Sequence, residues 1–157
     1  MSRTHFRSPD EKFLASIEWQ GDCLVWTAGM DGAGYGHLWD GGRRRMVKAH
    51  RYAWEREHGP IPDGMFIDHV CHNKVCVRVP HLRLATPAQN SRNRGRARSN
   101  TGHRNVHFAR GLYVVNVGHE GVQHKGWHKT LEEAVAHARA LRTELFGEFA
   151  GKESEDV

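Results

Sequence analysis

Short runs between glycine-containing segments, the first of them almost wholly apolar, predict strands in the first half of the chain. Three runs of this kind are expected to be strands: residues 23–27, 35–39 and 43–48. The last two flank Asp40-Gly41-Gly42, a turn sequence that favours a hairpin. Residues 49–58 then predict a short helix, which Gly59-Pro60 should end. The first ten residues are expected to be frayed, and residues 151–157 to form an acidic tail.

The middle of the chain predicts a strand, a loop, a second strand and a helix. The strands are expected over residues 65–70 and 81–86, with an irregular loop over 71–80 between them. Pro87 suits the first position of a helix, and Thr86 is a plausible N-cap. Asn90 would then lie in the first turn of this helix, facing back toward the strands.

The last third predicts an antiparallel sheet covered by one helix. Three runs read as its strands: residues 105–110, 113–118 and 122–128. Residues 130–133, Thr-Leu-Glu-Glu, form a capping box that should open a helix ended by Gly147. Its apolar positions recur at helical spacing and should pack on the sheet: Leu131, Ala134, Val135, Ala138, Leu141 and Leu145.

Charge is distributed unevenly along the 157 residues. Residues 41–129 carry seventeen basic and five acidic groups, whereas residues 1–40 have a net charge of −3 and residues 130–157 of −4. A strongly basic middle is typical of proteins that bind nucleic-acid phosphates, although a solvated basic surface is the plainer explanation. Residues 91–102 contain four arginines among small and polar residues, so they predict a basic linker.

Three cysteines and a histidine predict a structural zinc site. Cys71, Cys76 and His81 follow one another at intervals of five residues around the predicted loop. Thiolate and imidazole groups are the usual ligands of structural zinc, which needs four. We expect Cys23 to be the fourth ligand, with His58 and His72 as the other candidates. The alternative is a pair of buried cysteines beside a capped histidine.

A second set of residues in the same stretch suits phosphodiester hydrolysis. A neutral imidazole at His69 could take a proton from water as it attacks phosphorus. Asn90 offers an oxygen ligand for Mg²⁺ or Mn²⁺, and Asp68 could offer another. Adjacent strand residues point to opposite faces, so Asp68 and His69 can share a site only where the strand twists or ends. Alternatively, His69 is itself a zinc ligand, which would leave no base.

Residues 68–90 resemble the HNH (ββα-metal) endonucleases, especially the homing endonucleases of phages and introns. The Cys71-x4-Cys76-x4-His81 spacing is similar to that of the His-Cys-box branch, in which an upstream cysteine completes the zinc site. The resemblance implies that His69 is the general base, that Asn90 binds the catalytic ion, and that His81 occupies the middle motif position. Asp68 matches the Asp-His pair of phage members, which supports an active-site role.

Further segments extend this resemblance. Cys23-x2-Trp26-Thr27, Gly34-Tyr35-Gly36 and Ala49-His50-Arg51 are similar to those of phage members. Residues 101–149 resemble the DNA-binding module of plant ethylene-response factors, whose sheet reads the major groove. The domain prediction is a nuclease domain over residues 11–94, a linker over 91–102 and a DNA-binding module over 103–149. The expected DNA contacts are Arg43, Arg44, Arg45, Arg51, Arg92, Arg94, Arg96, Arg98, Arg104, Lys125 and Trp127.

The predicted class is α+β, with a zinc-stabilised ββα-metal core, an N-terminal hairpin region and a C-terminal three-stranded sheet on one helix. The predicted function is metal-dependent cleavage of double-stranded DNA by a monomer or homodimer. A noncatalytic zinc-containing DNA-binding protein is the alternative, and an RNA-binding zinc module is a third. The sequence has neither a transmembrane run nor a signal peptide, so we expect a cytoplasmic protein of a bacterium or a phage-infected cell.

Overall fold

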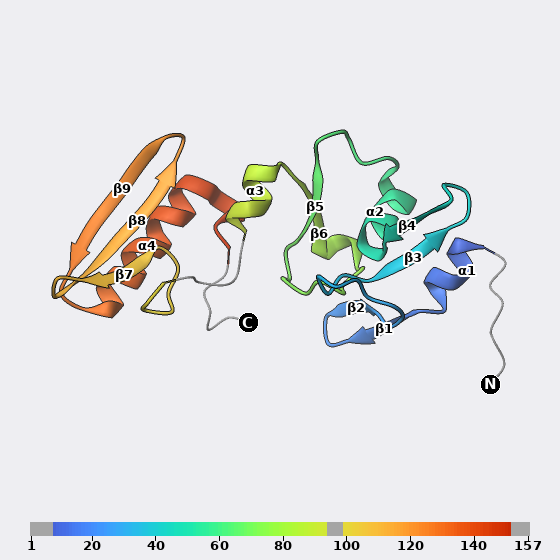
Figure 1. Cartoon of the computed structure of the whole chain (residues 1–157), viewed down its shortest axis with the longest axis horizontal. Helices are drawn as coiled ribbons and strands as arrows, with labels where there is room; N and C mark the ends of the chain where they lie inside the picture. The colour runs from blue at the N-terminus through green and yellow to red at the C-terminus, as the bar shows by residue number, and fades with distance from the viewer. Residues whose placement is uncertain (1–7, 94–98, 152–157) are drawn as a thin grey trace. The chain divides into compact units, whose positions relative to one another are not determined.

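The structure, a computed structural model, describes residues 8–93 and 99–151. The chain divides into two units, Met1–Thr86 and Pro87–Val157, each with its own core (Figure 1). Both units combine helices with small antiparallel sheets, so the predicted α+β class is confirmed. Arg94, Arg96 and Arg98 of the predicted linker lie outside the described residues.

The first unit begins with a short helix, α1, over Pro9–Leu14. Ser8 caps it, since its hydroxyl accepts a hydrogen bond from the backbone N–H of Glu11 at 3.2 Å. The expectation of a frayed start was therefore wrong for the end of that segment. Proline is well suited to the first helical position, because the N–H that it lacks would have no partner there.

Two hairpins follow α1. β1 (Ile17–Gln20) pairs with β2 (Cys23–Trp26), and β3 (His37–Asp40) pairs with β4 (Arg45–Lys48). The sequence predicted the second hairpin and strand β2, but not strand β1. Gly36, just before β3, lies against the indole of Trp26 so closely that any side chain there would overlap it.

The helix α2 covers Ala49–His58, as predicted, and ends at Gly59. Strand β5 (Phe66–His69) pairs with β6 (Leu82–Ala85), and His69 lies opposite Leu82. The irregular segment between them ends in a single turn of 3-10 helix, η1 (Val79–His81). The buried side chains of this unit's core come from α1, β2, β3, α2, β5, β6 and the segment between β5 and β6: Phe13, Trp26, Leu38, Ala49, Ala53, Ile67, Val77 and Leu82.

The second unit begins with α3 (Pro87–Arg92), which confirms the predicted helix after the second strand. Its sheet has the strand order β7 (Val106–Ala109), β8 (Leu112–His119) and β9 (Val122–His128).

Helix α4 (Leu131–Phe146) packs on one face of this sheet (Figure 1). The hydroxyl of Thr130 accepts a hydrogen bond from the N–H of Glu133 at 3.3 Å, as the capping box predicts. A last 3-10 turn, η2, covers Gly147–Phe149. Ala134 and Ala138 are fully buried against the sheet, and the rest of the predicted apolar stripe packs around them.

No helix within the described residues is both long enough and apolar enough to cross a membrane.

Candidate metal centre and active site

The candidate metal centre joins the first hairpin to the loop that follows β5. Cys23 is the first residue of β2, Cys71 follows β5, and His81 is the last residue of η1. The backbone fixes this arrangement, because the N–H of Trp26 donates to the carbonyl of Val75 at 2.8 Å. A second backbone bond of 2.7 Å runs from Val77 to Leu24, so β2 extends along the loop on both sides of Cys76.

The loop itself turns sharply around Asn73. Its side-chain oxygen accepts a hydrogen bond from the N–H of Val75 at 3.1 Å, and its carbonyl accepts one from the N–H of Cys76 at 3.1 Å. His72 has a φ of 60°, a conformation that non-glycine residues adopt uncommonly. Val70 closes the loop through a 2.9 Å bond to the carbonyl of His81.

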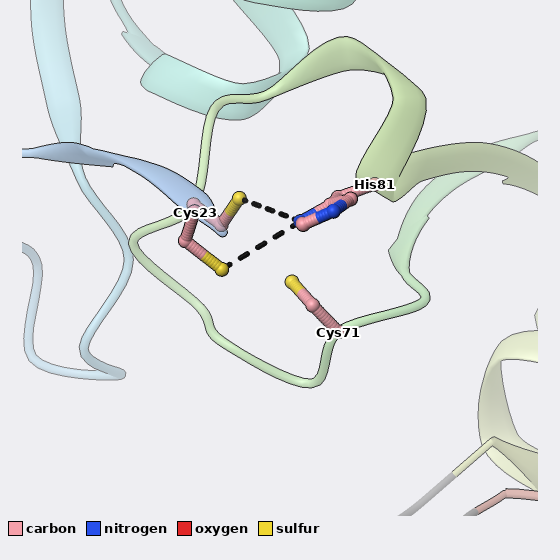
Figure 2. A group of neighbouring side chains, drawn as sticks. Cys23, Cys71 and His81 are labelled. Atoms are coloured by element: carbon pink, nitrogen blue, oxygen red, sulfur yellow. Dashed lines mark hydrogen bonds between the residues drawn. The ribbon is translucent and has the colours of Figure 1, made fainter. Parts of the chain in front are cut away.

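These constraints bring the four predicted zinc ligands together. The ligand atoms of Cys23, Cys71, Cys76 and His81 all lie within 4.8 Å of one another. Figure 2 labels three of these residues, Cys23, Cys71 and His81. The sulfurs of Cys23 and Cys76 are each 3.6 Å from Nδ1 of His81. Donors at about 2.0 and 2.3 Å from a tetrahedral zinc ion are separated by about 3.5–3.8 Å, so the distances fit. The donor set of three thiols and one imidazole also fits structural zinc.

One of the three thiols, that of Cys71, is favoured as the thiolate, whereas burial raises the pKa of Cys23 and the hydrogen bond to Cys71 raises that of Cys76. A hydrogen bond from the thiol of Cys76 is the main reason that the pKa of Cys71 falls to about 4. The thiolate is the metal-binding form of cysteine. Neither His58 nor His72 belongs to this group, and Cys23 takes the fourth position, as the sequence suggested.

The carboxylate of Asp22, which was not predicted to belong to the site, contacts the His81 ring on the side opposite the sulfurs. Nε2 of His81, the nitrogen that faces away from the sulfurs, lies 3.0 Å from a carboxylate oxygen of Asp22. Arg78 donates to both the carboxylate and the backbone carbonyl of Asp22. A zinc ion on Nδ1 requires the proton to lie on Nε2. The guanidinium of Arg78 is also 3.0 Å from Nε2 but cannot accept that proton's hydrogen bond, so the carboxylate of Asp22 is the acceptor. In the sequence, the only indication of this role was that Asp22 directly precedes the predicted ligand Cys23.

His69, the predicted general base, is the last residue of β5 and only 7% exposed. Its Nε2 lies 3.1 Å from the carbonyl oxygen of Cys76. A carbonyl can only accept, so Nε2 carries a proton and the neutral ring has its lone pair on Nδ1. Burial lowers the pKa of His69, which favours this neutral form. His69 is not part of the Cys23–His81 ligand cluster.

Asp68 and Asn90 are the predicted ligands of the catalytic ion. Asp68 is buried, and Nε of Arg83, opposite it on β6, donates to its carboxylate at 2.9 Å. Strand β5 ends at His69, one residue further on, which is where adjacent side chains need not diverge. Asn90 lies on α3 in the second unit, whereas His69 lies in the first. The ion that these residues would share therefore stays a prediction.

His50 and Tyr35 also contact the predicted base, and the sequence analysis gave neither of them a role. The ring centroid of His50 is 4.7 Å from that of His69, with the rings edge to face. Tyr35 lies 5.4 Å from His50 and 6.1 Å from His69. The signal in the sequence was the resemblance of Gly34-Tyr35-Gly36 and Ala49-His50-Arg51 to phage members.

The arginines of the first unit differ in their surroundings. Arg43 forms an ion pair with Asp40 within the hairpin and another with Glu55, which connects the hairpin to α2. Arg44 and Arg45 are exposed at and beside the hairpin turn, where Arg44 has a φ of 50°. Exposed guanidinium groups at a turn are well placed to meet phosphates, whereas that of Arg43 already has two carboxylate partners.

In the second unit, Lys125 and Trp127 are exposed at alternate positions of β9. Arg104 instead donates to the carbonyls of Ala150 at 2.9 Å and Arg92 at 2.6 Å, and burial lowers its pKa. The guanidinium of Arg92 stacks over a ring of Phe146. The predicted DNA contacts of this unit are therefore most accessible on β9.

Comparison with known proteins agrees with this geometry. The family model for HNH endonucleases matches residues 47–92, which include α2, β5, the cysteine loop, β6 and α3. Protein 3.8 of Escherichia phage T7 is 38% identical over 109 residues, which cover 68% of this chain and 90% of that protein. The chain belongs to the HNH endonuclease family.

Two further proteins that the chain resembles are also viral. Protein 7.7 of Escherichia phage T7 is 41% identical over 70 residues, 45% of this chain and 52% of that protein. A protein of Acanthamoeba polyphaga mimivirus named as an uncharacterized HNH endonuclease is 34% identical over 120 residues, 75% of this chain and 62% of that protein. The chain thus spans about half of protein 7.7 and less than two thirds of the mimivirus protein. No solved structure matches it.

Proposed function

We propose that this protein is a metal-dependent endonuclease that hydrolyses phosphodiester bonds of double-stranded DNA in the phage-infected cell. The observation that carries the proposal is the hydrogen bond between Nε2 of His69 and the carbonyl of Cys76. It fixes the tautomer of a buried imidazole and attaches that imidazole to the backbone of a zinc-binding residue.

In this mechanism Nδ1 of His69 accepts a proton from the water that attacks phosphorus. The bond from phosphorus to the 3′ oxygen then breaks, and that oxygen takes a proton from a solvent water, which leaves a 5′-phosphate and a 3′-hydroxyl. A Mg²⁺ or Mn²⁺ ion held by Asn90, and also by Asp68, would stabilise the charge that develops on the leaving oxygen. Asp68 would have to share its carboxylate with Arg83, which now donates to it.

DNA binding is assigned to both units. The exposed Arg44 and Arg45 of the β3–β4 hairpin would meet phosphates, together with Arg51 and the linker arginines. Residues 103–149 would act as an ethylene-response-factor-like module in which Lys125 and Trp127 face the duplex. We assign the protein to the homing type of nuclease that its motifs resemble, acting as a monomer or homodimer.

Substitution of His69 by alanine tests the proposal. We expect Mg²⁺-dependent nicking or linearisation of supercoiled plasmid to fall by at least about 10²-fold, because the proton acceptor is lost. Zinc content should stay at the wild-type level, since His69 is not in the ligand cluster. His58→Ala, which removes an exposed histidine from the end of α2, is the matched control and should cut normally.

Cleavage that survives His69→Ala, or zinc that is lost with it, would contradict these roles. A wild-type protein that binds zinc and DNA but never cuts with Mg²⁺ or Mn²⁺ would instead favour the noncatalytic DNA-binding alternative.

A further inference from the structure

The N-terminus of helix α2 carries positively charged side chains, although the N-terminus of a helix favours negative charge. Lys48 is its N-cap residue, His50 and Arg51 lie in its first turn, and this turn contains no acidic residue. Among the described residues, no side chain caps the helix. The backbone N–H groups of a helix N-terminus attract anions and disfavour cations, so this arrangement is unfavourable until an anion binds.

A buried polar atom lies in the same turn. His50 is only 4% exposed, and its Nδ1 has no hydrogen-bond partner among the described residues. Helical side chains lean toward the N-terminus of their helix, so the ring leans over the first turn. Burial, followed by the charges of His69 and Lys48, lowers the pKa of His50 to about 2, so the ring is neutral. A phenylalanine would fill this space without an unpaired buried nitrogen, whose desolvation is costly.

Two ammonium groups complete the surroundings of this turn. Nζ of Lys48 lies 3.9 Å from the ring centroid of Tyr35, and Nζ of Lys74 lies 5.4 Å from it. Tyr35 itself packs against the rings of both His50 and His69. Residues far apart in the sequence therefore place positive charge around Tyr35, whose ring packs against the predicted base.

One carboxylate lies nearby, and it has a structural task. Asp31 accepts hydrogen bonds from the N–H groups of Ala33 at 2.9 Å and Tyr35 at 3.0 Å, so it builds the turn that carries Tyr35. Its distance of 3.8 Å from Nζ of Lys48 makes a long ion pair between partly exposed groups. Such a pair is weak, so Lys48 can also interact with a ligand.

We propose that the first turn of α2, with Nδ1 of His50 and the ammonium groups of Lys48 and Lys74, binds the DNA phosphodiester that is cut. Nδ1–H of His50 donates a hydrogen bond to a non-bridging oxygen of that phosphate. The 4.7 Å between the His50 and His69 rings then places the phosphorus beside the base. This inference rests on the proposed nuclease function and adds to it the residues that hold the substrate.

The test compares two substitutions at His50 in the full-length, zinc-loaded protein. His50→Phe keeps the ring but removes the donor, whereas His50→Asn keeps a donor near the position of Nδ1. We expect single-turnover cleavage to slow by about 10²-fold in His50→Phe, because one hydrogen bond to the reacting phosphate is lost. His50→Asn should remain within about tenfold of the wild-type rate. Zinc content and thermal midpoint are measured alongside, with His58→Phe on the same helix as the matched control.

A modified substrate separates a contact to phosphate from a structural effect. Once the cut position is mapped on an oligonucleotide duplex, a methylphosphonate at that position removes one charged oxygen. Wild-type cleavage should slow, and His50→Phe should lose little more, because both changes delete the same contact. The proposal is overturned if His50→Phe cuts at the wild-type rate, or if the two losses are fully additive.

A binding measurement keeps this inference distinct from the nuclease proposal. Should the wild-type protein cut no DNA, or His50→Phe fail to fold, inorganic phosphate is added to the His69→Ala protein and the histidine ring NMR signals are followed. A phosphate-dependent shift of the His50 signals would support the anion site even if the nuclease proposal has failed. Signals that do not respond to millimolar phosphate would overturn it.

Discussion

Burial sets the charge of His50. The ring is almost completely removed from solvent, and this desolvation is the main reason that its pKa falls to about 2. The charges of His69, Lys48 and Arg51 lower the pKa further, while Asp31 raises it slightly. Water cannot stabilise an imidazolium ion in this position, so the folded protein keeps the ring neutral.

This neutral ring predicts a pH dependence of stability. Below pH 6.5 the unfolded chain binds a proton at His50 that the folded chain does not, so the free energy of unfolding falls as the pH falls. The loss should approach about 1.4 kcal/mol per pH unit. His50→Phe should lack this contribution, and urea unfolding of both proteins at pH 7.0 and 5.5 measures it.

Other groups, including the thiols of the metal centre, also change stability with pH. They are present in both proteins, so the difference between wild type and His50→Phe isolates the contribution of His50. Parallel losses of stability in the two proteins would contradict the prediction.

The hairpin of β1 and β2 acts as one side of the metal centre. Its turn supplies Asp22, and its second strand begins with Cys23. The guanidinium of Arg78, which bonds to Asp22, also lies over the ring of Trp19 on β1. The hairpin thus positions one ligand directly and orients His81 through a second residue.

Asp22→Asn should therefore weaken zinc binding. We expect a loss of about 10–100-fold in affinity, because the hydrogen bond that fixes the His81 ring and its tautomer becomes weaker. Competition with a chromophoric chelator measures the affinity. Asp63→Asn, an exposed carboxylate in the loop before β5, is the matched control. Unchanged affinity in Asp22→Asn would show that Asp22 does not support the metal ligand.

The sequence predicted those elements that are determined by neighbouring residues, such as a turn sequence or a helical repeat of apolar positions. The Asp40-Gly41-Gly42 turn predicted the β3–β4 hairpin, and the 3.6-residue spacing predicted α4. Strand β1, Ile-Glu-Trp-Gln, does alternate apolar and polar residues, but a run of only four residues is a weak signal, and three of its four side chains are exposed. Helix α1 is only six residues long, and its signal is the cap alone.

The grouping of Cys71, Cys76 and His81 was predictable because their spacing is typical of metal ligands, whereas Cys23 was expected there only as the remaining cysteine and from the family resemblance. The environments of His50 and Arg142 were not predictable. Arg142 lies on α4 with 1% exposure and donates to the carbonyl of Arg104. Whether a polar side chain is buried depends on which distant segments pack over it, and no local pattern reports that.

The protein consists of two units, each with its own apolar core. The first unit also joins its hairpins through the cluster of Cys23, Cys71, Cys76 and His81, whereas the core of the second lies between one sheet and one helix. Small units with irregular loops gain much of their folding free energy from structural zinc. The second unit contains none of the four ligands.

Removal of zinc should therefore affect the two units differently. A strong chelator is expected to unfold the first unit, and tryptophan fluorescence reports it because Trp19, Trp26, Trp39 and Trp54 lie there, with only Trp127 in the second. Limited proteolysis should then leave a protected fragment that contains β7–β9 and α4. Loss of this fragment at the same chelator concentration would contradict the prediction.

The separation between Cys23 and His81 also governs when the zinc site can form during synthesis. The two residues are 58 positions apart, so Cys23 leaves the ribosome well before its partner. At translation speeds of about 5–20 residues per second, the interval is roughly 3–12 s. During that time the nascent thiol is exposed to oxidants and to competing metals. The metal centre of the first unit can therefore form only after His81 has been synthesised. In the second unit, by contrast, each strand of the sheet can pair with its sequence neighbour as soon as that neighbour emerges.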